Sequence, residues 1–455
     1  MKIKSTSDKT ALFETMPAWQ AVLKVCIPTI AGTLVMVLYS LADTFFVGKV
    51  NDPIQNAAVT LAAPLLMAFN AVNNLFGVGT SSMMGRGLGR KDYDTVARSS
   101  SFGFYGAIIS GILFAFVYTI CSSFVLRILG TDSLTYVETR RYLLWTCSFG
   151  AVPAILNVVM SNLVRAEGSA LNASIGAMSG CLLNIILDPF FILPQFLNMG
   201  AAGAGLATFI SNCFACLYFF IFLFIKRGKT FVCINPKRLT LNKEIVIGVL
   251  AVGIPAAIQN ILNVTGMTIQ NNFASGYGSN VVASMGISSK ITSISFFVAM
   301  AIGQGVMPLL AYNFGAKNPN RMKELLSFTV KLDIGILAVT TSVYMIFAPQ
   351  LIRMFMNDEL IVSYGKIFLR SMASAIPFLC IDFLAVGFFQ ACGYGKYSLI
   401  FAFLRKIILE IPALLILNIL IPVYGIGFSQ TFAEIGMCIA SVFMVRKVFK
   451  KIESI

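Results

Sequence analysis

The sequence predicts an all-α polytopic membrane protein in which twelve transmembrane helices form two pseudo-symmetric six-helix bundles. Composition, an internal repeat and the placement of basic residues lead to this prediction. Hydrophobic residues make up 57% of the 455-residue chain and charged residues 12%, with a mean hydropathy of +0.83. A bilayer-spanning helix needs about 20 apolar residues. The chain therefore has room for about twelve spans and for no sizeable soluble domain.

The first half holds six apolar segments, at about 21–47, 57–84, 100–124, 140–163, 171–194 and 201–225. The start of the chain, residues 1–16, is polar and basic, so we expect no cleavable signal peptide. A basic linker at 226–244 then divides the chain nearly in half. We expect residues 1–225 to form an N-terminal lobe, the linker to be cytoplasmic, and residues 245–455 to form a C-terminal lobe.

After the linker the spacing of prolines and glycines begins again. Ile27-Pro28 recurs as Ile254-Pro255, and Lys91 recurs 226 positions later as Lys317. Pro189 recurs as Pro412. Six spans is an even number, so both repeats enter the membrane from the same side. We therefore expect parallel repeats related by an axis along the membrane normal.

Basic residues sort between alternate sets of loops. One set holds Lys2, Lys4, Lys9, Arg86, Arg90, Lys91, Arg98, Arg165, Lys226, Arg227, Lys229, Lys237, Arg238, Lys243, Lys317, Arg321, Lys323, Lys396, Arg446, Lys447, Lys450 and Lys451. The opposite set holds Lys49, Arg127, Arg140, Arg141, Arg353 and Lys366. Basic residues accumulate in cytoplasmic loops, so we expect both termini in the cytoplasm of a plasma-membrane protein. The accumulation of basic residues in cytoplasmic loops accounts for the net charge of +15, which therefore indicates no nucleic-acid partner.

The histidine and cysteine content limits the proton-transfer, metal and redox chemistry that the protein can perform. The chain has no histidine, so any proton handling falls to carboxylates. Its ten cysteines fall mostly inside apolar segments, as core residues do. Cys213 and Cys216 have the spacing of a metal or redox motif, but they lie in an apolar helix with no further ligands. No cofactor is expected beyond a coupling ion, H⁺ or Na⁺.

Two carboxylates at membrane depth are the main candidates for a functional site. Asp188 lies in an apolar run, four residues after Asn184 and just before Pro189, and Asp43 lies four residues after Tyr39. On a helix, each polar residue shares a face with its carboxylate. An isolated Asp at the centre of a membrane helix costs about 2.5–3.5 kcal/mol, so it needs a partner, a wet cavity or a proton. The alternative is that either residue caps a helix end at the membrane surface.

The C-terminal half does not repeat this pair. The repeat places Gln270 where the first half has Asp43, and Ile411, next to Glu410, where it has Asp188. The second half carries its own charges, which are Asp382, Arg405, Lys406, Glu410 and Glu434. Lys406 and Glu410 are four residues apart, which favours a structural ion pair. The role of Asp382 stays open.

Taken together, these motifs resemble the multidrug and toxic compound extrusion (MATE) family, nearest its bacterial MepA-like branch. The similar stretches are DTFFVG at 43–48, GRGLGRKD at 85–92, RAEG at 165–168, NIILDP at 184–189 and PLLAYNFGAK at 308–317. The resemblance covers about residues 15–448. It implies a twelve-helix exporter with a central cavity and coupling to protons or sodium.

The resemblance also implies site residues. It assigns the N-terminal cation and substrate site to Tyr39, Asp43, Asn157, Asn184, Asp188 and Thr208, with Pro28 as a helix bend and a sodium site at Asp43, Asn184 and Asp188. Members that use a sodium site in the C-terminal lobe have a carboxylate in span 7. Here span 7 offers only amides such as Gln259 and Gln270. We therefore expect Asp382, Arg405, Glu410 and these two amides to be secondary.

Several functions remain open from the sequence. The first is antiport that exports amphipathic, mostly cationic drugs through a monomer surrounded by membrane lipid, because acidic and aromatic side chains suit an organic cation. The second is a flippase for lipid-linked sugars, which would need Arg405 and Lys406 to face the cavity. A membrane-embedded enzyme would have to use an Asp43–Asp188 dyad without any histidine. A passive channel would leave the duplicated, proline-interrupted helices unexplained.

Overall fold

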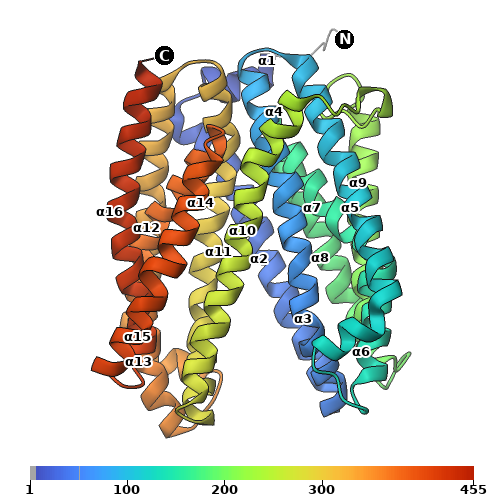
Figure 1. Ribbon diagram of the computed structural model, residues 1–455, viewed down its shortest axis with the longest axis vertical. Helices are drawn as coiled ribbons and strands as arrows, with labels where there is room; N and C mark the ends of the chain where they lie inside the picture. The colour runs from blue at the N-terminus through green and yellow to red at the C-terminus, as the bar shows by residue number, and fades with distance from the viewer. Residues whose placement is uncertain (1–6, 51, 455) are drawn as a thin grey trace.

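The computed structural model of the chain describes residues 7–50 and 52–454, and its regular secondary structure within these ranges is helical. Lys2 and Lys4, two of the basic residues in the predicted topology, lie outside the described residues. The helices form two groups, and both ends of the chain lie at the same end of the molecule (Figure 1).

The first half begins with a short helix and continues with long ones. They are α1 (Ser7–Glu14), α2 (Ala18–Lys49), α3 (Pro53–Asn73), α4 (Gly79–Gly89), α5 (Tyr93–Ile128), α6 (Tyr136–Leu143), α7 (Ala151–Ala166), α8 (Ala170–Ile192) and α9 (Gly200–Ile225). A π-helical turn, η1 (Asn74–Val78), joins α3 to α4. A second one, η2 (Leu144–Phe149), leads from α6 to α7, and the two parts of this span are bent by 52°.

The second half follows the same plan. Its elements are η3 (Pro236–Arg238), α10 (Lys243–Ser275), α11 (Ser279–Gly315), α12 (Pro319–Arg353), α13 (Glu359–Ala391), α14 (Gly395–Phe403), η4 (Leu404–Glu410), α15 (Ile411–Leu420) and α16 (Gly425–Glu453). Side chains that accept backbone N–H bonds fix several helix starts, among them Asp92 before α5 and Asn318 before α12. Pro28 lies inside α2, which continues as one helix from Ala18 to Lys49.

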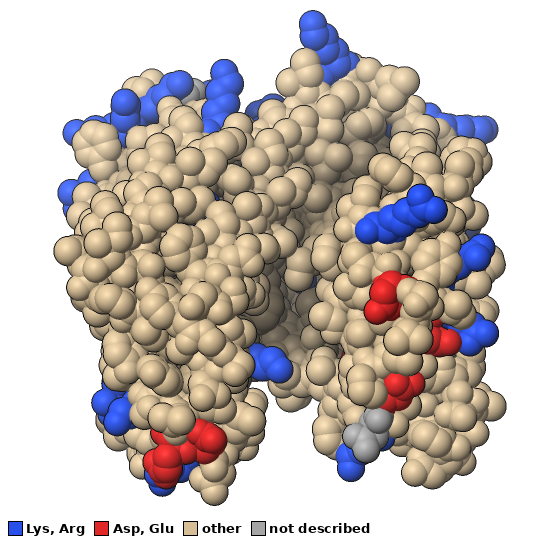
Figure 2. All heavy atoms as spheres, turned by 60° about the horizontal axis from the view of Figure 1, so that its bottom comes forward, with Lys and Arg blue, Asp and Glu red and all other residues tan. Residues whose placement is uncertain are grey.

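Nine helical rods of the described chain are long and apolar enough to cross a bilayer, and the bent α6–α7 pair makes a tenth. Two further rods, α14–η4–α15 and α16, run beside them (Figure 1). We call α2–α9 the N-terminal lobe and α10–α16 the C-terminal lobe. The lobes approach each other near the chain termini and diverge toward the opposite end (Figure 1), where the molecular surface is hollowed into a deep cleft (Figure 2).

Close contacts between the lobes occur in reciprocal pairs. Gly89 of α4 packs against the Tyr312 backbone of α11 so closely that a Cβ would not fit, and Gly315 of α11 packs in the same way against Arg86 of α4. Gly89 and Gly315 are equivalent in the repeat, and so are Arg86 and Tyr312. One contact is therefore made twice, as two halves related by a two-fold axis require.

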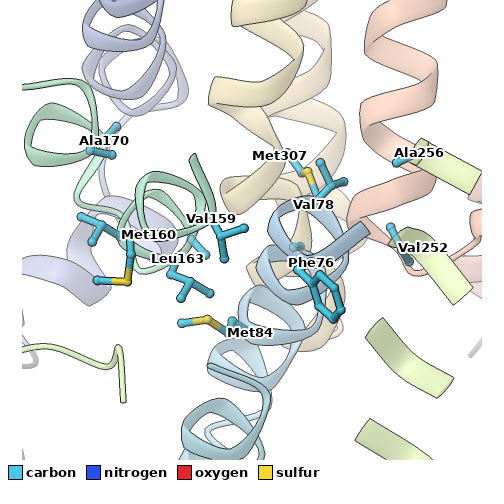
Figure 3. Packing of buried hydrophobic residues seen from close by; sticks show 14 of the residues in the cluster. Phe76, Val78, Met84, Val159, Met160, Leu163, Ala170, Val252, Ala256 and Met307 are labelled. Atoms are coloured by element: carbon cyan, nitrogen blue, oxygen red, sulfur yellow. The ribbon is translucent and has the colours of Figure 1, made fainter. Parts of the chain in front are cut away.

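A second pair of contacts follows the same rule deeper in the molecule. A Cβ on Gly79 would lie 3.2 Å from the Cα of Gly253 in α10, and a Cβ on Gly305 would lie 3.2 Å from the Cα of Cys26 in α2. The apolar core also crosses between the lobes. Phe76 and Met307 belong to one cluster of buried side chains, part of which Figure 3 shows.

The linker that joins the two lobes is hydrogen-bonded to the N-terminal lobe. The Glu167 carboxylate accepts hydrogen bonds from the Phe231 N–H at 2.6 Å and from the Thr230 hydroxyl at 2.9 Å. The Tyr105 hydroxyl donates to the Ile234 carbonyl at 2.9 Å. The first part of the predicted linker is thus held against α5 and the α7–α8 turn. The domain boundaries at 225 and 245 stay predictions.

Candidate functional site

Asp188 lies inside a helix and is completely buried, with 0% of its side chain exposed. Helix α8 continues through Pro189 to Ile192, so Asp188 does not cap a helix end at the membrane surface. Proline has no N–H, which deprives the Ile185 carbonyl of its usual helical partner. The carboxylate therefore lies beside a local weakness in the helix.

Asn184 supplies the hydrogen bonds that Asp188 needs. With the amide oriented so that both of its ends have partners, Asn184 Nδ2 donates to Asp188 Oδ2 at 2.9 Å and to Oδ1 at 3.2 Å. In that orientation Asn184 Oδ1 accepts from the Thr208 N–H of α9 at 3.0 Å. The predicted i,i+4 relation of Asn184 and Asp188 is thus a direct contact that also ties α8 to α9.

Asp43 and Tyr39 approach this group from α2. Asp43 is half-buried, and its Oδ1 is shielded from solvent without a hydrogen-bond partner. The Tyr39 hydroxyl hydrogen-bonds with the Thr208 side chain and interacts electrostatically with both Asp43 and Asp188. The structure therefore brings Tyr39, Asp43, Asn184, Asp188 and Thr208 together in one place.

Asn157, the sixth predicted residue, joins the group indirectly. Its Nδ2 donates to Asn212 Oδ1 at 3.2 Å, and Asn212 Nδ2 donates to the Thr208 carbonyl at 2.9 Å. Sequence reasoning missed Asn212, although it follows Thr208 by four residues, the spacing that drew attention to the other pairs. It also missed Tyr142, a buried tyrosine that interacts electrostatically with Asp43, Tyr39 and Asp188.

A cavity of about 180 Å³ lies next to the carboxylates. It is lined by Tyr39, Leu66, Phe69, Asn70, Asn73, Tyr142, Thr146, Gly150, Ala154, Thr208, Phe209 and Asn212. Aromatic rings and amides thus form much of its wall. Asp43 and Asp188 do not line it, but Tyr39, which interacts electrostatically with both, does. A larger hollow of about 470 Å³ lies elsewhere in the N-terminal lobe, lined by Asp52 and Trp145 among others, and none of the predicted site residues line it.

The two N-terminal carboxylates have no basic partner within the residues that the structure describes. Among the described residues, no Lys or Arg forms an ion pair with Asp43 or Asp188. Burial disfavours the charged form of a carboxyl group, and so does a second negative charge nearby. Such a pair can bind a proton, a small inorganic cation or the ammonium group of an organic molecule. No group of three or more His, Cys, Asp or Glu side chains in the described part of the chain is arranged so that it could hold a metal ion. The sodium site at Asp43, Asn184 and Asp188 stays a prediction.

The C-terminal carboxylates lie in a different setting. The Arg405 guanidinium of η4 is 2.5 Å from Glu434 Oε1 of α16 and 3.6 Å from Asp382 Oδ2 of α13. Lys406 Nζ is 2.6 Å from Glu410 Oε2, which is the i,i+4 pair that the sequence predicts. All five charged side chains are largely or fully buried. Both cations are therefore occupied within the protein, and neither is free to hold the pyrophosphate of a flippase substrate.

The two span 7 amides differ in their surroundings. Gln270, the repeat counterpart of Asp43, donates from Nε2 to Glu410 Oε1 at 3.3 Å and so joins the C-terminal cluster. Gln259 is half-buried on α10, eleven residues before Gln270. In the described residues the C-terminal cluster thus has three carboxylates, two cations and an amide.

Fold and site together define a polytopic membrane transporter with an acidic site in one of two related lobes. Comparison with known proteins assigns the chain to the same class, membrane transporters. The MatE family model matches twice, at residues 28–190 and 255–416, once in each half of the repeat. The chain belongs to the MATE family of membrane transporters, and it is a transporter and not an enzyme.

The relatives cover nearly the whole chain. The Multidrug export protein MepA of Staphylococcus aureus is 34% identical over 436 residues, which is 95% of this chain and 94% of MepA. The MepA of Staphylococcus saprophyticus is 32% identical over 435 residues, with the same coverage. The predicted family and its branch are confirmed.

Solved structures establish the fold. An outward-facing multidrug resistance MATE transporter of the MOP superfamily superposes with a TM-score of 0.93 at 23% identity, over 99% of this chain and 100% of that one. A MOP superfamily transporter from Pyrococcus furiosus gives a TM-score of 0.91 at 24% identity, over 99% of this chain and 100% of that one. The prediction of twelve membrane helices in two bundles is confirmed.

Proposed function

We propose that this protein is a cation-coupled antiporter that exports amphipathic, mostly cationic compounds from the cell by alternating access. The observation that carries the proposal is the pair Asp43 and Asp188. These two carboxylates lie beside an aromatic and amide-lined cavity and have no basic partner in the described part of the chain. Its relatives are named multidrug export proteins, which supports small-molecule export as the activity of this chain.

The polarity of transport follows from the proposed topology. Basic residues crowd the end of the molecule where the termini lie (Figure 2), which supports cytoplasmic termini in a plasma membrane. The cleft opens at the other end, so this conformation would face the outside. Its similarity to a transporter described as outward-facing supports the same assignment.

Competition for the carboxylates would couple the two fluxes. In the inward-facing state the ionised pair attracts a cationic compound, and aromatic rings such as Tyr39 and Phe209 add stacking and cation–π contacts. In the outward-facing state, protons or sodium ions from outside neutralise the pair and weaken its hold on the compound. Only a differential affinity between two states can shift their populations, and this exchange supplies it.

Transport in proteoliposomes tests the proposal. A fluorescent organic cation is loaded, and pH and sodium gradients are imposed separately, with Asp188→Asn as the matched control. We expect one of the two gradients to drive uphill movement of the cation in the wild type and neither to drive it in the variant. Uphill transport at the wild-type rate by Asp188→Asn would contradict the role of the N-terminal pair.

A further inference from the structure

A third isolated carboxylate lies outside both charge clusters, in the middle of α12. Asp333 is completely buried, and neither of its oxygens has a hydrogen-bond partner among residues 7–50 and 52–454. No basic residue in the described ranges pairs with it. Ionisable groups inside membrane-spanning helices are expensive to bury, and they usually serve ion or proton transfer.

Asp333 lies where the lobes meet. It interacts electrostatically with Cys26 of α2, across the lobe boundary, and with Cys380 of α13. Cys26 itself touches the other lobe, because its Sγ lies 3.8 Å from the Ile302 carbonyl of α11. Helix α2 thus covers Asp333 in this arrangement, in which the lobes are closed at this end.

The surroundings of Asp333 hold few titratable groups. Cys26 is the only one on α2 between Lys24 and Tyr39, and Cys380 is the only one on α13 between Arg370 and Asp382. Helix α11 has none between Lys290 and Tyr312. On α16, Cys438 interacts electrostatically with Cys380 and with Glu434. On α12 itself, Lys331 is exposed on another face. None of these groups supplies the positive charge that an ionised Asp333 would need.

The internal repeat indicates that packing alone does not require this carboxylate. At the shift of 226 residues that relates α5 to α12, the position of Asp333 corresponds to Ala107. Ala107 is also completely buried, in the equivalent helix of the N-terminal lobe. A small apolar side chain satisfies the fold there, so the carboxyl group in α12 points to a function.

We propose that Asp333 is a second proton-binding site, separate from Asp43 and Asp188, which holds a proton while the lobes are packed together around it and releases it when they part. The inference rests on the proposed alternating access, although it does not depend on which ion drives export. A carboxylic acid can remain in this dry, unpartnered position, whereas a carboxylate cannot. When α2 moves away, water reaches the group and it ionises.

The consequence is a pH dependence with a defined sign. The closed arrangement binds one proton more at Asp333 than the open arrangement does. Low pH on the side of the termini therefore favours the closed arrangement, and high pH favours opening there. The open population can rise by at most about tenfold per pH unit for a single proton.

Cys26 offers a direct reporter of this opening. It is 0% exposed in the closed arrangement and contacts Ile302 across the lobe boundary. A variant that keeps Cys26 as its only cysteine is reconstituted in nanodiscs, and its maleimide labelling rate is measured from about pH 5.5 to about pH 9. The same labelling rate is measured for a second variant, which has Cys26 as its only cysteine and also carries Asp333→Asn. Both chains carry the same thiol, so its intrinsic ionisation cancels in the ratio of the two rates. The negative charge of an ionised Asp333 beside Cys26 would only slow labelling, which is opposite to the expected change.

We expect the labelling rate with Asp333, divided by the rate with Asp333→Asn, to rise with pH. Only the chain with Asp333 gains an open population as the group ionises. Asp333→Glu should restore the rise, and Asp333→Ala, with the residue of the other repeat, should abolish it as Asp333→Asn does. A ratio that stays flat over this range would overturn the inference. Asp43→Asn should leave the rise intact, and its loss there would assign the proton to the N-terminal pair and also overturn the inference.

Infrared spectroscopy provides a readout that does not need transport. The carbonyl stretching band of protonated carboxyl groups is recorded at neutral pH for the wild type, Asp333→Asn and Asp333→Glu. We expect Asp333→Asn to lose part of this band and Asp333→Glu to keep its intensity at a shifted frequency. An unchanged band in Asp333→Asn would show that Asp333 is ionised in the closed protein and would overturn the inference. Failure of cation export in liposomes, in contrast, would affect the proposed function alone.

Discussion

The two lobes share one fold, but the Asp43–Asp188 pair of the N-terminal lobe and the charge cluster around Arg405 in the C-terminal lobe have opposite surroundings. In the N-terminal lobe, Asp43 and Asp188 have amide and hydroxyl neighbours and no ion-pair partner among the described residues. In the C-terminal lobe, Asp382 and Glu434 flank Arg405, and Glu410 pairs with Lys406. The first arrangement leaves a charge that an external cation can neutralise, whereas the second is largely neutralised from within.

This difference shows how, in a duplicated fold, one lobe can carry the binding site while a charge cluster in the other lobe stabilises the structure. A buried ion pair whose geometry is satisfied has little to gain from a further cation, and breaking it is costly. A carboxylate held only by amides changes its preferred partner with the pH, the salt and the ligand around it. We therefore expect substitutions of Asp43 and Asp188 to affect transport, and substitutions in the charge cluster around Arg405 to affect stability.

The largest expected effect is the loss of coupled export in Asp188→Asn. The amide keeps the shape and part of the hydrogen bonding to Asn184, but it removes the group that exchanges a cation for the drug. Uphill transport should fall to the level of empty liposomes, while the protein still folds and inserts, as size-exclusion chromatography would show. Asp43→Asn should behave in the same or nearly the same way.

The second effect concerns stability. Arg405→Leu leaves Asp382 and Glu434 buried without their cation, and removing one partner of a buried ion pair costs about 3–5 kcal/mol. We expect a marked fall in the midpoint of thermal unfolding in detergent. The double variant Arg405→Leu with Glu434→Gln should recover part of the loss. Equal midpoints for the single variant and the wild type would mean that the C-terminal charges are not neutralised in the way described here.

A smaller effect is expected for Asp382→Asn. Arg405 lies 3.6 Å from Asp382 but 2.5 Å from Glu434, so it keeps its closer partner when Asp382 is neutralised. The variant should retain substantial drug export in the same liposome assay. If its export falls as far as that of Asp188→Asn, then the division of roles between the lobes is wrong.

The smallest effect lies in the turn that both lobes repeat. Asp92 caps α5 with hydrogen bonds from the Thr95 hydroxyl at 2.6 Å and the Thr95 N–H at 3.1 Å, and these bonds hold the pKa of Asp92 below its ordinary value. The equivalent cap in the C-terminal lobe is Asn318, which accepts from the Arg321 N–H at 3.1 Å. Only the first of the two caps can titrate.

The sign of the pH effect follows from that lowered pKa. The stability that Asp92 adds is present above its unfolded pKa of about 4 and is lost as the pH falls through the folded pKa. Asp92→Asn should thus cost about 1 kcal/mol or less at neutral pH, and the difference from the wild type should shrink at about pH 3. Thermal unfolding of both proteins at the two pH values measures it, and a constant difference would contradict the prediction.

The sequence could predict the fold because hydrophobic composition indicates the membrane spans, and the spacing of prolines and glycines indicates the repeat. It could also predict the N-terminal pair, because Asn184 and Asp188 are four residues apart on one helix. Contacts between distant segments were beyond its reach. Arg405 bridges α13, η4 and α16, Asn212 enters through a side chain on α9, and Asp333 becomes notable only when its lack of partners is visible.

The reciprocal glycines, Gly89 with Gly315 and Gly79 with Gly305, carry an evolutionary consequence. A surface in which residue i of one half meets residue j of the other, and j meets i, is the interface of an isologous homodimer. Such a surface fits a single gene ancestor that paired with its own copy before duplication fused the two. Along the axis neither half could enlarge a side chain alone, since each glycine faces the backbone of the other half. Away from the axis no such reciprocity applied, and there Asp43 and Gln270, or Ala107 and Asp333, were free to become different residues.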